Sequence, residues 1–143
     1  MSMQTNIDYG YGVIASEIEI TDVKKLEQLI HLAPEYEEEF KSYFADNDVK
    51  EPTVEDYLKY EVEYGLADIL KNVIMECEGI DLYTCGDEWG RDYLLYLPTY
   101  PWYMNRRDRR MTEKKIAKRF NKYLAYITDR KDCVDYQRCE KCG

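Results

Sequence analysis

The chain has 143 residues, of which 45% are apolar and 34% charged, a balance that excludes a disordered protein and predicts one globular domain over residues 1–143. No apolar run approaches the roughly 20 residues of a membrane-spanning helix, and the first residues lack the basic and apolar regions of a signal peptide. We therefore expect a cytoplasmic protein that does not contact a membrane.

The net charge of −9 conceals two parts of opposite sign. Residues 1–90 carry 22 acidic and 6 basic side chains, whereas residues 91–143 carry 7 acidic and 14 basic ones. The chain also contains 15 tyrosines against 3 phenylalanines. Because tyrosine combines apolar area with a hydroxyl group, it suits half-buried positions and interfaces. This composition favours a protein that contacts another macromolecule.

The first part of the chain predicts one strand followed by three helices. Alternating apolar residues predict a strand over residues 11–20. Thr21 is the expected N-cap of a first helix, which ends before Pro34, and Pro34 itself opens a second helix. Thr53 caps a third helix. The second helix carries an aromatic stripe at helical spacing, formed by Tyr36, Phe40, Tyr43 and Phe44.

A long buried helix and a hairpin follow. Apolar residues recur at helical spacing from residue 66 to residue 77, and Gly79 suits the left-handed end of that helix. Residues 80–85 and 93–97 predict two strands around the turn GDEWGR. The second strand, YLLYL, is apolar on both faces, so we expect a central strand with helices on one side.

The last helix is expected to begin at Thr112, and a short edge strand is expected around residues 134–136. This order of elements predicts the α+β class, with a small antiparallel sheet of three or four strands packed against four to five helices. A mostly helical protein with one hairpin is the alternative.

The five cysteines predict free thiols rather than a disulfide framework, because their number is odd and no signal peptide precedes them. Cys133, Cys139 and Cys142 have the spacing C-x5-C-x2-C, but a structural zinc site needs four ligands, usually in two close pairs. The remaining candidates are the distant Cys77 and Cys85 or the single histidine. We therefore assign no metal and no cofactor.

The pattern of residues gives little support for a catalytic site. His31 is the only histidine, which excludes any dyad of two histidines, and its place near a helix end indicates a structural or exposed role. Asp87 and Glu88 could support metal-assisted nuclease chemistry, but no lysine accompanies them in the hairpin. We interpret these two acids as turn residues and assign no catalytic residue.

An acidic surface on the second and third helices is the main candidate for binding. Its carboxylates could mimic backbone phosphates and occupy the basic groove of a nucleic-acid enzyme, with tyrosines as contact anchors. The other interpretation is ordinary solubilising charge. The predicted contact residues, including the hairpin turn, are Glu35, Glu37, Glu38, Glu39, Asp46, Asp48, Glu55, Asp56, Tyr60, Asp87, Glu88 and Trp89.

A basic segment over residues 106–122 is the alternative candidate. Arginines and lysines beside aromatic residues are typical of phosphate contacts next to base stacking. A solvated helix face that offsets the acidic remainder is the competing interpretation, and the pI of about 4.7 argues against a general nucleic-acid binder. The candidate residues are Trp102, Tyr103, Arg106, Arg107, Arg109, Arg110, Lys114 and Lys118.

Several segments together carry a resemblance: the start YGYG, the stretch GIDLYTCGDEWGRDYLLYLPTYPWYM and the later KYLAYITDRKDCVDYQ. The chain resembles small accessory proteins carried by phages and mobile elements of Gram-positive bacteria, although its tail RCEKCG departs from their pattern. Proteins from that setting are often antagonists of host defence, including anti-CRISPR inhibitors. The resemblance implies a non-catalytic inhibitor that binds a host protein or ribonucleoprotein complex in the host cytoplasm.

Overall fold

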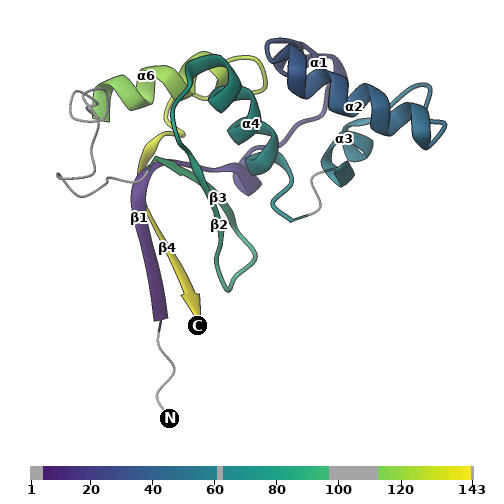
Figure 1. The fold of residues 1–143 in the computed structure, drawn as a ribbon. Helices are drawn as coiled ribbons and strands as arrows, with labels where there is room; N and C mark the ends of the chain where they lie inside the picture. Colours follow the sequence, from purple (N-terminus) through teal and green to yellow (C-terminus); the bar gives the residue numbers. More distant parts are fainter. Residues whose placement is uncertain (1–4, 61–62, 97–112, 143) are drawn as a thin grey trace.

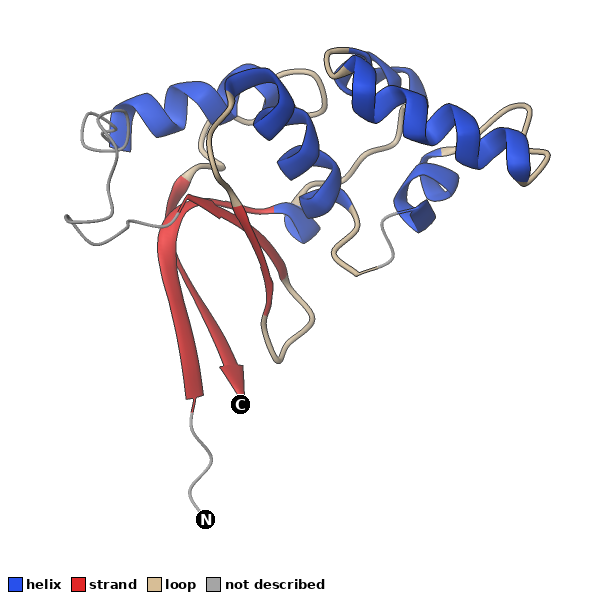
Figure 2. Cartoon of the chain, viewed as in Figure 1, coloured by secondary structure: helices blue, strands red, loops and turns tan. Residues whose placement is uncertain are grey.

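A computed structural model gives the fold and describes residues 5–60, 63–96 and 113–142. These residues form a four-stranded antiparallel sheet and five α-helices (Figures 1 and 2). The predicted α+β class is therefore confirmed. The strands are β1 (Thr5–Ile14), β2 (Tyr83–Gly86), β3 (Asp92–Tyr96) and β4 (Asp135–Cys142). The helices are α1 (Val23–His31), α2 (Pro34–Asp46), α3 (Val54–Tyr60), α4 (Leu66–Glu78) and α6 (Glu113–Leu124).

The helix α4 lies at the centre of the fold. It contacts β2 and β3 on one side and α1, α2 and α6 on the others. Its apolar stripe is the one that the sequence predicts up to Ile74, whereas Cys77, the last predicted member, is exposed. Gly79 ends the helix with a φ of 65°, a conformation that favours glycine. The buried stripe consists of Leu66, Ile69, Leu70, Val73 and Ile74.

The strand β3 is buried on both faces, as the pattern YLLYL predicts. Leu94 and Tyr96 pack into the main core beneath the helices. Tyr93 and Leu95 point to the opposite face, where they form a second, smaller core with a pair of cysteines. β3 also lies inside the sheet, whose order is β2-β3-β1-β4. No helix is needed over the second face, because the sheet itself curls around it.

This curl brings the two edge strands together. Cys85 on β2 and Cys139 on β4 are joined by a disulfide across the second core, and both are fully buried. Figure 1 shows the β1–β4 and β2–β3 pairs descending from the helices as two limbs of one bent sheet. Gly12 permits a close approach of β1 to β3, because a Cβ atom there would overlap the backbone carbonyl oxygen of Leu94 on β3.

The disulfide corrects the expectation of free thiols for two of the five cysteines. Cys77 and Cys133 are free, as expected, whereas Cys85 and Cys139 are bonded although 54 residues separate them. No pattern in the sequence predicts this pair, because the contact between the two cysteines depends on the curl of the sheet. The spacing of Cys133, Cys139 and Cys142 therefore does not define a ligand set.

The predicted strand over residues 11–20 is wrong in its position. β1 begins earlier and ends at Ile14, after which a short 3-10 turn spans Ala15–Glu17. β1 ends here because its backbone pairing with β3 stops. The backbone N–H of Asp92 donates to the Ser16 hydroxyl oxygen at 2.9 Å and not to a backbone carbonyl of β1. Ile18 and Ile20 still pack against the main core, but from an irregular segment.

The ends of other helices and strands differ from the predicted ones by a few residues. The N-cap of α1 is Asp22, whose Oδ1 accepts from the backbone N–H of Lys24 at 2.9 Å, and not Thr21. The first hairpin strand is shorter than residues 80–85, and β4 is longer than residues 134–136 but does lie at the sheet edge. Thr112 lies outside the described residues.

Removing the disulfide is expected to lower the free energy of unfolding by about 2–4 kcal/mol, because a crosslink over a long loop restricts the unfolded chain. The double variant Cys85→Ala/Cys139→Ala and the reduced wild type should show similar losses in urea unfolding. Cys77→Ser is the matched control, since that cysteine is exposed and takes part in no disulfide. Equal stability of the oxidised and reduced wild type would contradict the closure of the sheet by this bond.

Candidate interaction surface

The predicted acidic surface lies on α2, α3 and the loop between them, residues 34–60, which we call the acidic arm. The acidic arm has nine acidic and three basic side chains. In Figure 1 it extends from α4 to the side away from the sheet limbs. Since this arm contacts the sheet little and projects outward, its outer face is available to a large partner.

An aromatic cluster makes the acidic arm rigid. The Phe40 ring lies 4.9 Å from the Tyr36 ring, 5.1 Å from Tyr57 and 4.6 Å from Tyr60, measured between centroids. Phe44 packs edge-on against Tyr57 at 4.9 Å. Such pairs add to the stabilisation from apolar burial. The predicted aromatic stripe of α2 is thus the contact between α2 and α3.

The acidic arm is fixed to the fold by a carboxylate of α4. Glu76 accepts hydrogen bonds from the backbone N–H groups of Glu35 at 3.2 Å and Tyr36 at 3.0 Å, the first residues after Pro34. A negative charge is favoured at this helix N-terminus. Sequence reasoning missed Glu76, because its partners are about 40 residues away and only packing of α2 on α4 brings them together.

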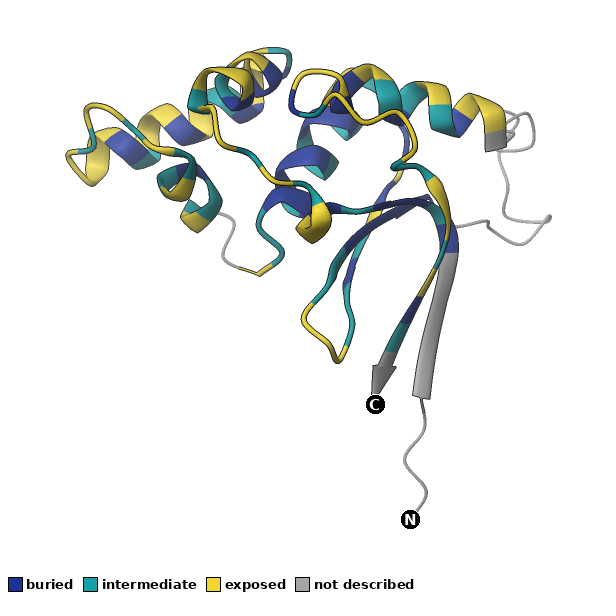
Figure 3. Ribbon diagram, turned by 180° about the vertical axis from the view of Figure 1, so that it is seen from behind, coloured by how far each residue is buried: buried dark blue, intermediate teal, exposed yellow. Residues whose placement is uncertain are grey.

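Seven acidic side chains of the acidic arm are exposed to solvent (Figure 3). Glu38 is the clearest example, with 71% of its side chain accessible and only a 3.5 Å contact to Lys41. On α2, residues three or four positions apart lie on the same face, so the exposed carboxylates follow the outer side of the helix. The seven are Glu35, Glu38, Glu39, Asp46, Asp48, Glu51 and Glu55.

Three of the predicted contact residues stabilise the arm itself. Glu37 lies 2.9 Å from His31 Nδ1 and 3.4 Å from Lys41 Nζ. Burial would raise the pKa of Glu37, but the hydrogen bonds from these two side chains outweigh it and lower the pKa. Asp56 accepts from the Thr53 backbone N–H at 2.9 Å and caps α3 with it. Tyr60 donates to Glu39 at 3.2 Å.

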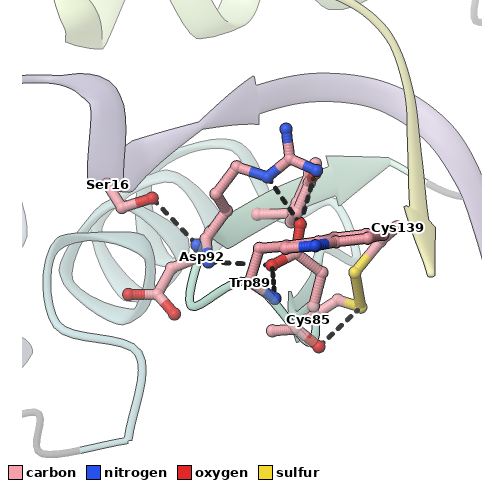
Figure 4. Close-up of polar contacts among 9 residues, drawn as sticks. Ser16, Cys85, Trp89, Asp92 and Cys139 are labelled. Atoms are coloured by element: carbon pink, nitrogen blue, oxygen red, sulfur yellow. Dashed lines mark hydrogen bonds and ion pairs between the residues drawn. A yellow bond between two sulfur atoms is a disulfide. The ribbon is translucent and has the colours of Figure 1, made fainter. Parts of the chain in front are cut away.

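The hairpin turn is organised by the Asp87 carboxylate, whose side chain is fully buried. Figure 4 shows the polar contacts of this turn around Trp89. Its Oδ1 accepts from the backbone N–H groups of Trp89 and Arg91 at 3.0 and 2.9 Å. Its Oδ2 accepts from Arg91 Nε at 2.6 Å and from the Tyr93 hydroxyl at 2.9 Å. All its acceptor sites are engaged, so Asp87 shapes the turn rather than contacting a partner.

The titration of this cluster follows from its hydrogen bonds. Burial tends to raise the pKa of Asp87, but the donors of Arg91, Tyr93 and Trp89 outweigh it and hold the pKa below the ordinary range. Burial and the hydrogen bond to Asp87 raise the pKa of Tyr93 to about 12. Near neutral pH the turn therefore contains a charged carboxylate and a neutral phenol.

Trp89 is the most exposed of the large apolar side chains that the structure describes, with 61% of its surface accessible. The Arg91 guanidinium carbon lies 5.4 Å from the Trp89 ring centroid and 5.8 Å from that of Tyr93, within the range of cation–π attraction. Trp and Arg together are typical of interface anchors. Sequence reasoning selected Trp89 and the exposed Glu88 but missed Arg91 and Tyr93.

The turn and the acidic arm are separate surfaces. Figures 1 and 3 show the β2–β3 turn at the lower end of its limb, whereas α2 lies beside the other helices above the sheet. The structure therefore divides the predicted contact residues into two groups. One group, on α2 and α3, carries concentrated negative charge, and the other presents a single ordered tryptophan.

The alternative basic surface is described only in part. Lys114 and Lys118 are exposed on α6 with Lys122, at the predicted spacing of four, whereas Arg119 points towards α4, with Nη1 3.5 Å from Glu78 Oε1. The other candidate residues, Trp102, Tyr103, Arg106, Arg107, Arg109 and Arg110, lie outside the described residues.

Within the described ranges, no group of three or more His, Cys, Asp or Glu side chains is arranged to hold a metal ion, and no helix has the length and hydropathy needed to cross a membrane. A comparison of the chain with models of known protein families, with curated protein sequences and with solved structures finds no match. The function must therefore be argued from the surfaces themselves.

Replacing Asp87 by asparagine is expected to lower the free energy of unfolding by about 1–3 kcal/mol at neutral pH, because the amide cannot accept from both Arg91 and Tyr93. A native pKa below the ordinary value means that this stabilisation is fully present above about pH 4 and disappears as the pH falls through the native pKa. The difference between wild type and Asp87→Asn should therefore shrink in acid.

Urea unfolding at pH 7 and near pH 3, followed by circular dichroism, measures this difference. Asp81→Asn is the control, since Asp81 is exposed. A difference that stays constant over this range would show that the Asp87 charge does not stabilise the turn.

Proposed function

We propose that the protein is a non-catalytic binding protein that inhibits a nucleic-acid-processing machine by occupying its basic, nucleic-acid-binding surface. The observation that supports this is the acidic arm, where exposed carboxylates follow the outer side of a helix that is held rigid from within. Exposed carboxylates are denser within residues 34–60 than in the other described parts of the chain, which favours a specific acidic face over solubilisation alone.

Rigidity matters for such a competitor. Binding loses less free energy when the contacting groups are already ordered. The aromatic cluster and the Glu76 cap order α2 before it meets a partner. Carboxylates spaced one helical turn apart then meet the lysines and arginines that would otherwise contact phosphates, and this complementarity also accelerates association.

The resemblance to phage and mobile-element accessory proteins makes a CRISPR effector the first candidate partner, with the host cytoplasm as the place of action. Disulfides are rare in reducing cytosol. Both sulfur atoms of the Cys85–Cys139 bond are buried, however, and limited access slows thiol–disulfide exchange. The bond is therefore compatible with that location.

Charge reversal on the outer side of α2 is expected to weaken the complex about tenfold or more. The variant Glu38→Lys/Asp46→Lys removes two exposed carboxylates of the acidic arm, whereas Asp81→Lys/Asp129→Lys changes the net charge equally at exposed sites elsewhere. Gel filtration with purified effectors in rising salt measures binding. Wild-type affinity should fall steeply with salt. Equal weakening by both variants would contradict a specific acidic face.

The exposed lysines of α6 support a second candidate function, contact with RNA or DNA through the basic segment 106–122. In that case Lys114→Ala/Lys118→Ala should reduce retention of nucleic acid in a filter-binding assay and flatten its salt dependence, because fewer counterions are released. Lys24→Ala/Lys25→Ala is the matched control on exposed positions of α1. Retention of nucleic acid that is unchanged by the α6 variant would remove this surface from consideration.

A further inference from the structure

A groove of about 780 Å³ lies where the segment before α1 faces the start of α3. Its apolar lining comes from Ile20 and Val23 on one wall and from Pro52, Val54 and Leu58 on the other. All five are half-buried. Ile20, Val23, Val54 and Leu58 pack against the main core on one side and leave apolar surface open on the other. The groove is thus continuous with a well-packed wall and does not depend on mobile side chains.

The charge around this groove has one sign. Glu51 and Glu55 line it and are exposed, and the other described lining residues with polar side chains are Thr21 and Thr53. Among the described residues, no lysine or arginine lines the groove. An occupant therefore needs apolar side chains for the floor and positive charge at the edges, because a carboxylate or phosphate there would be repelled.

The backbone of the occupant must satisfy its own hydrogen bonds. A peptide that binds as an added strand needs a free sheet edge. These walls are instead formed by α3 with the loop before it and by residues 20–23 at the start of α1. A helix forms all its backbone bonds internally and can present aliphatic side chains at positions i, i+3, i+4 and i+7 to an apolar groove. The walls therefore favour a helical occupant.

We propose that this groove binds an amphipathic helix of the partner protein, with aliphatic side chains on one face and lysine or arginine on the flanks. The inference rests on the proposed function, because it describes how the acidic arm would engage a basic partner. Glu55 belongs to both the groove and the predicted contact residues, so one basic protein surface can cover the outer carboxylates while its helix enters the groove.

The probe is a fluorescent synthetic peptide of about 14 residues, roughly four helical turns, with leucines at i, i+3, i+4 and i+7 and lysines on the flanks. A scrambled peptide of the same composition is the matched control for charge. In an anisotropy titration the amphipathic peptide is expected to bind about tenfold tighter or more than the scrambled one. Equal binding of the two, or no binding of either, would overturn the proposal.

Substitutions in the groove then locate the site. Val54→Arg places a cation between the walls and is expected to weaken peptide binding about tenfold or more, whereas Lys25→Arg, on the exposed side of α1, should leave it unchanged. Thr21→Trp fills the groove from an exposed position on the opposite wall and tests the same point if Val54→Arg does not fold. Circular dichroism verifies the fold of each variant. Full retention of peptide binding by a folded groove variant would overturn the site.

The two proposals can fail separately. Glu38→Lys/Asp46→Lys lies outside the groove lining, so it should weaken the complex with an effector yet leave peptide binding largely intact. If effectors bind through α2 while groove variants bind them with unchanged affinity, the groove inference falls alone. If the peptide binds in the groove but no effector is bound at low salt, the inhibitor proposal falls and the groove remains a peptide-binding site.

Discussion

The curl of the sheet is the constraint on which the rest of this structure depends. A flat sheet in the order β2-β3-β1-β4 would place its edge strands far apart, with one face under the helices and the other in water. The bend of the sheet turns the second face inward, and the Cys85–Cys139 bond holds it there. Tyr93 and Leu95 are buried as a result, and edges that invite aggregation are brought together.

The same constraint orders the turn that displays Trp89. Tyr93 belongs to the second core, yet its hydroxyl reaches Asp87 at 2.9 Å. The carboxylate thereby connects a buried strand residue to the backbone of the turn and to Arg91. The exposed Trp89 ring thus follows a turn whose backbone is fixed by charge-assisted hydrogen bonds.

On the other side of α4, the helices likewise use one set of residues for packing and leave another set exposed. Aromatic rings hold α2 to α3, Glu76 holds α2 to α4, and Glu37 and Asp56 satisfy local partners. Apart from Glu39, which accepts from Tyr60, the carboxylates that remain exposed therefore lie on a scaffold held together by other groups. This separation allows the outer face of the acidic arm to change its charge with little effect on folding, which suits a surface that recognises another protein.

The sequence alone determined the class of the fold, the buried stripe of α4, the central position of β3 and the acidic character of α2, because each follows from local periodicity and composition. It also selected Trp89 and Glu38 as surface residues. Only the tertiary structure decided which acids are structural, since Asp87 and Glu37 look like Glu38 in the sequence but meet donors through folding.

The Cys85–Cys139 pair, the Glu76 cap and the groove beside Val54 likewise join residues that are distant along the chain. Periodicity reports which face of an element is buried, but not which other element covers it. That choice depends on how strands curl and helices cross, which is a property of the whole packed chain.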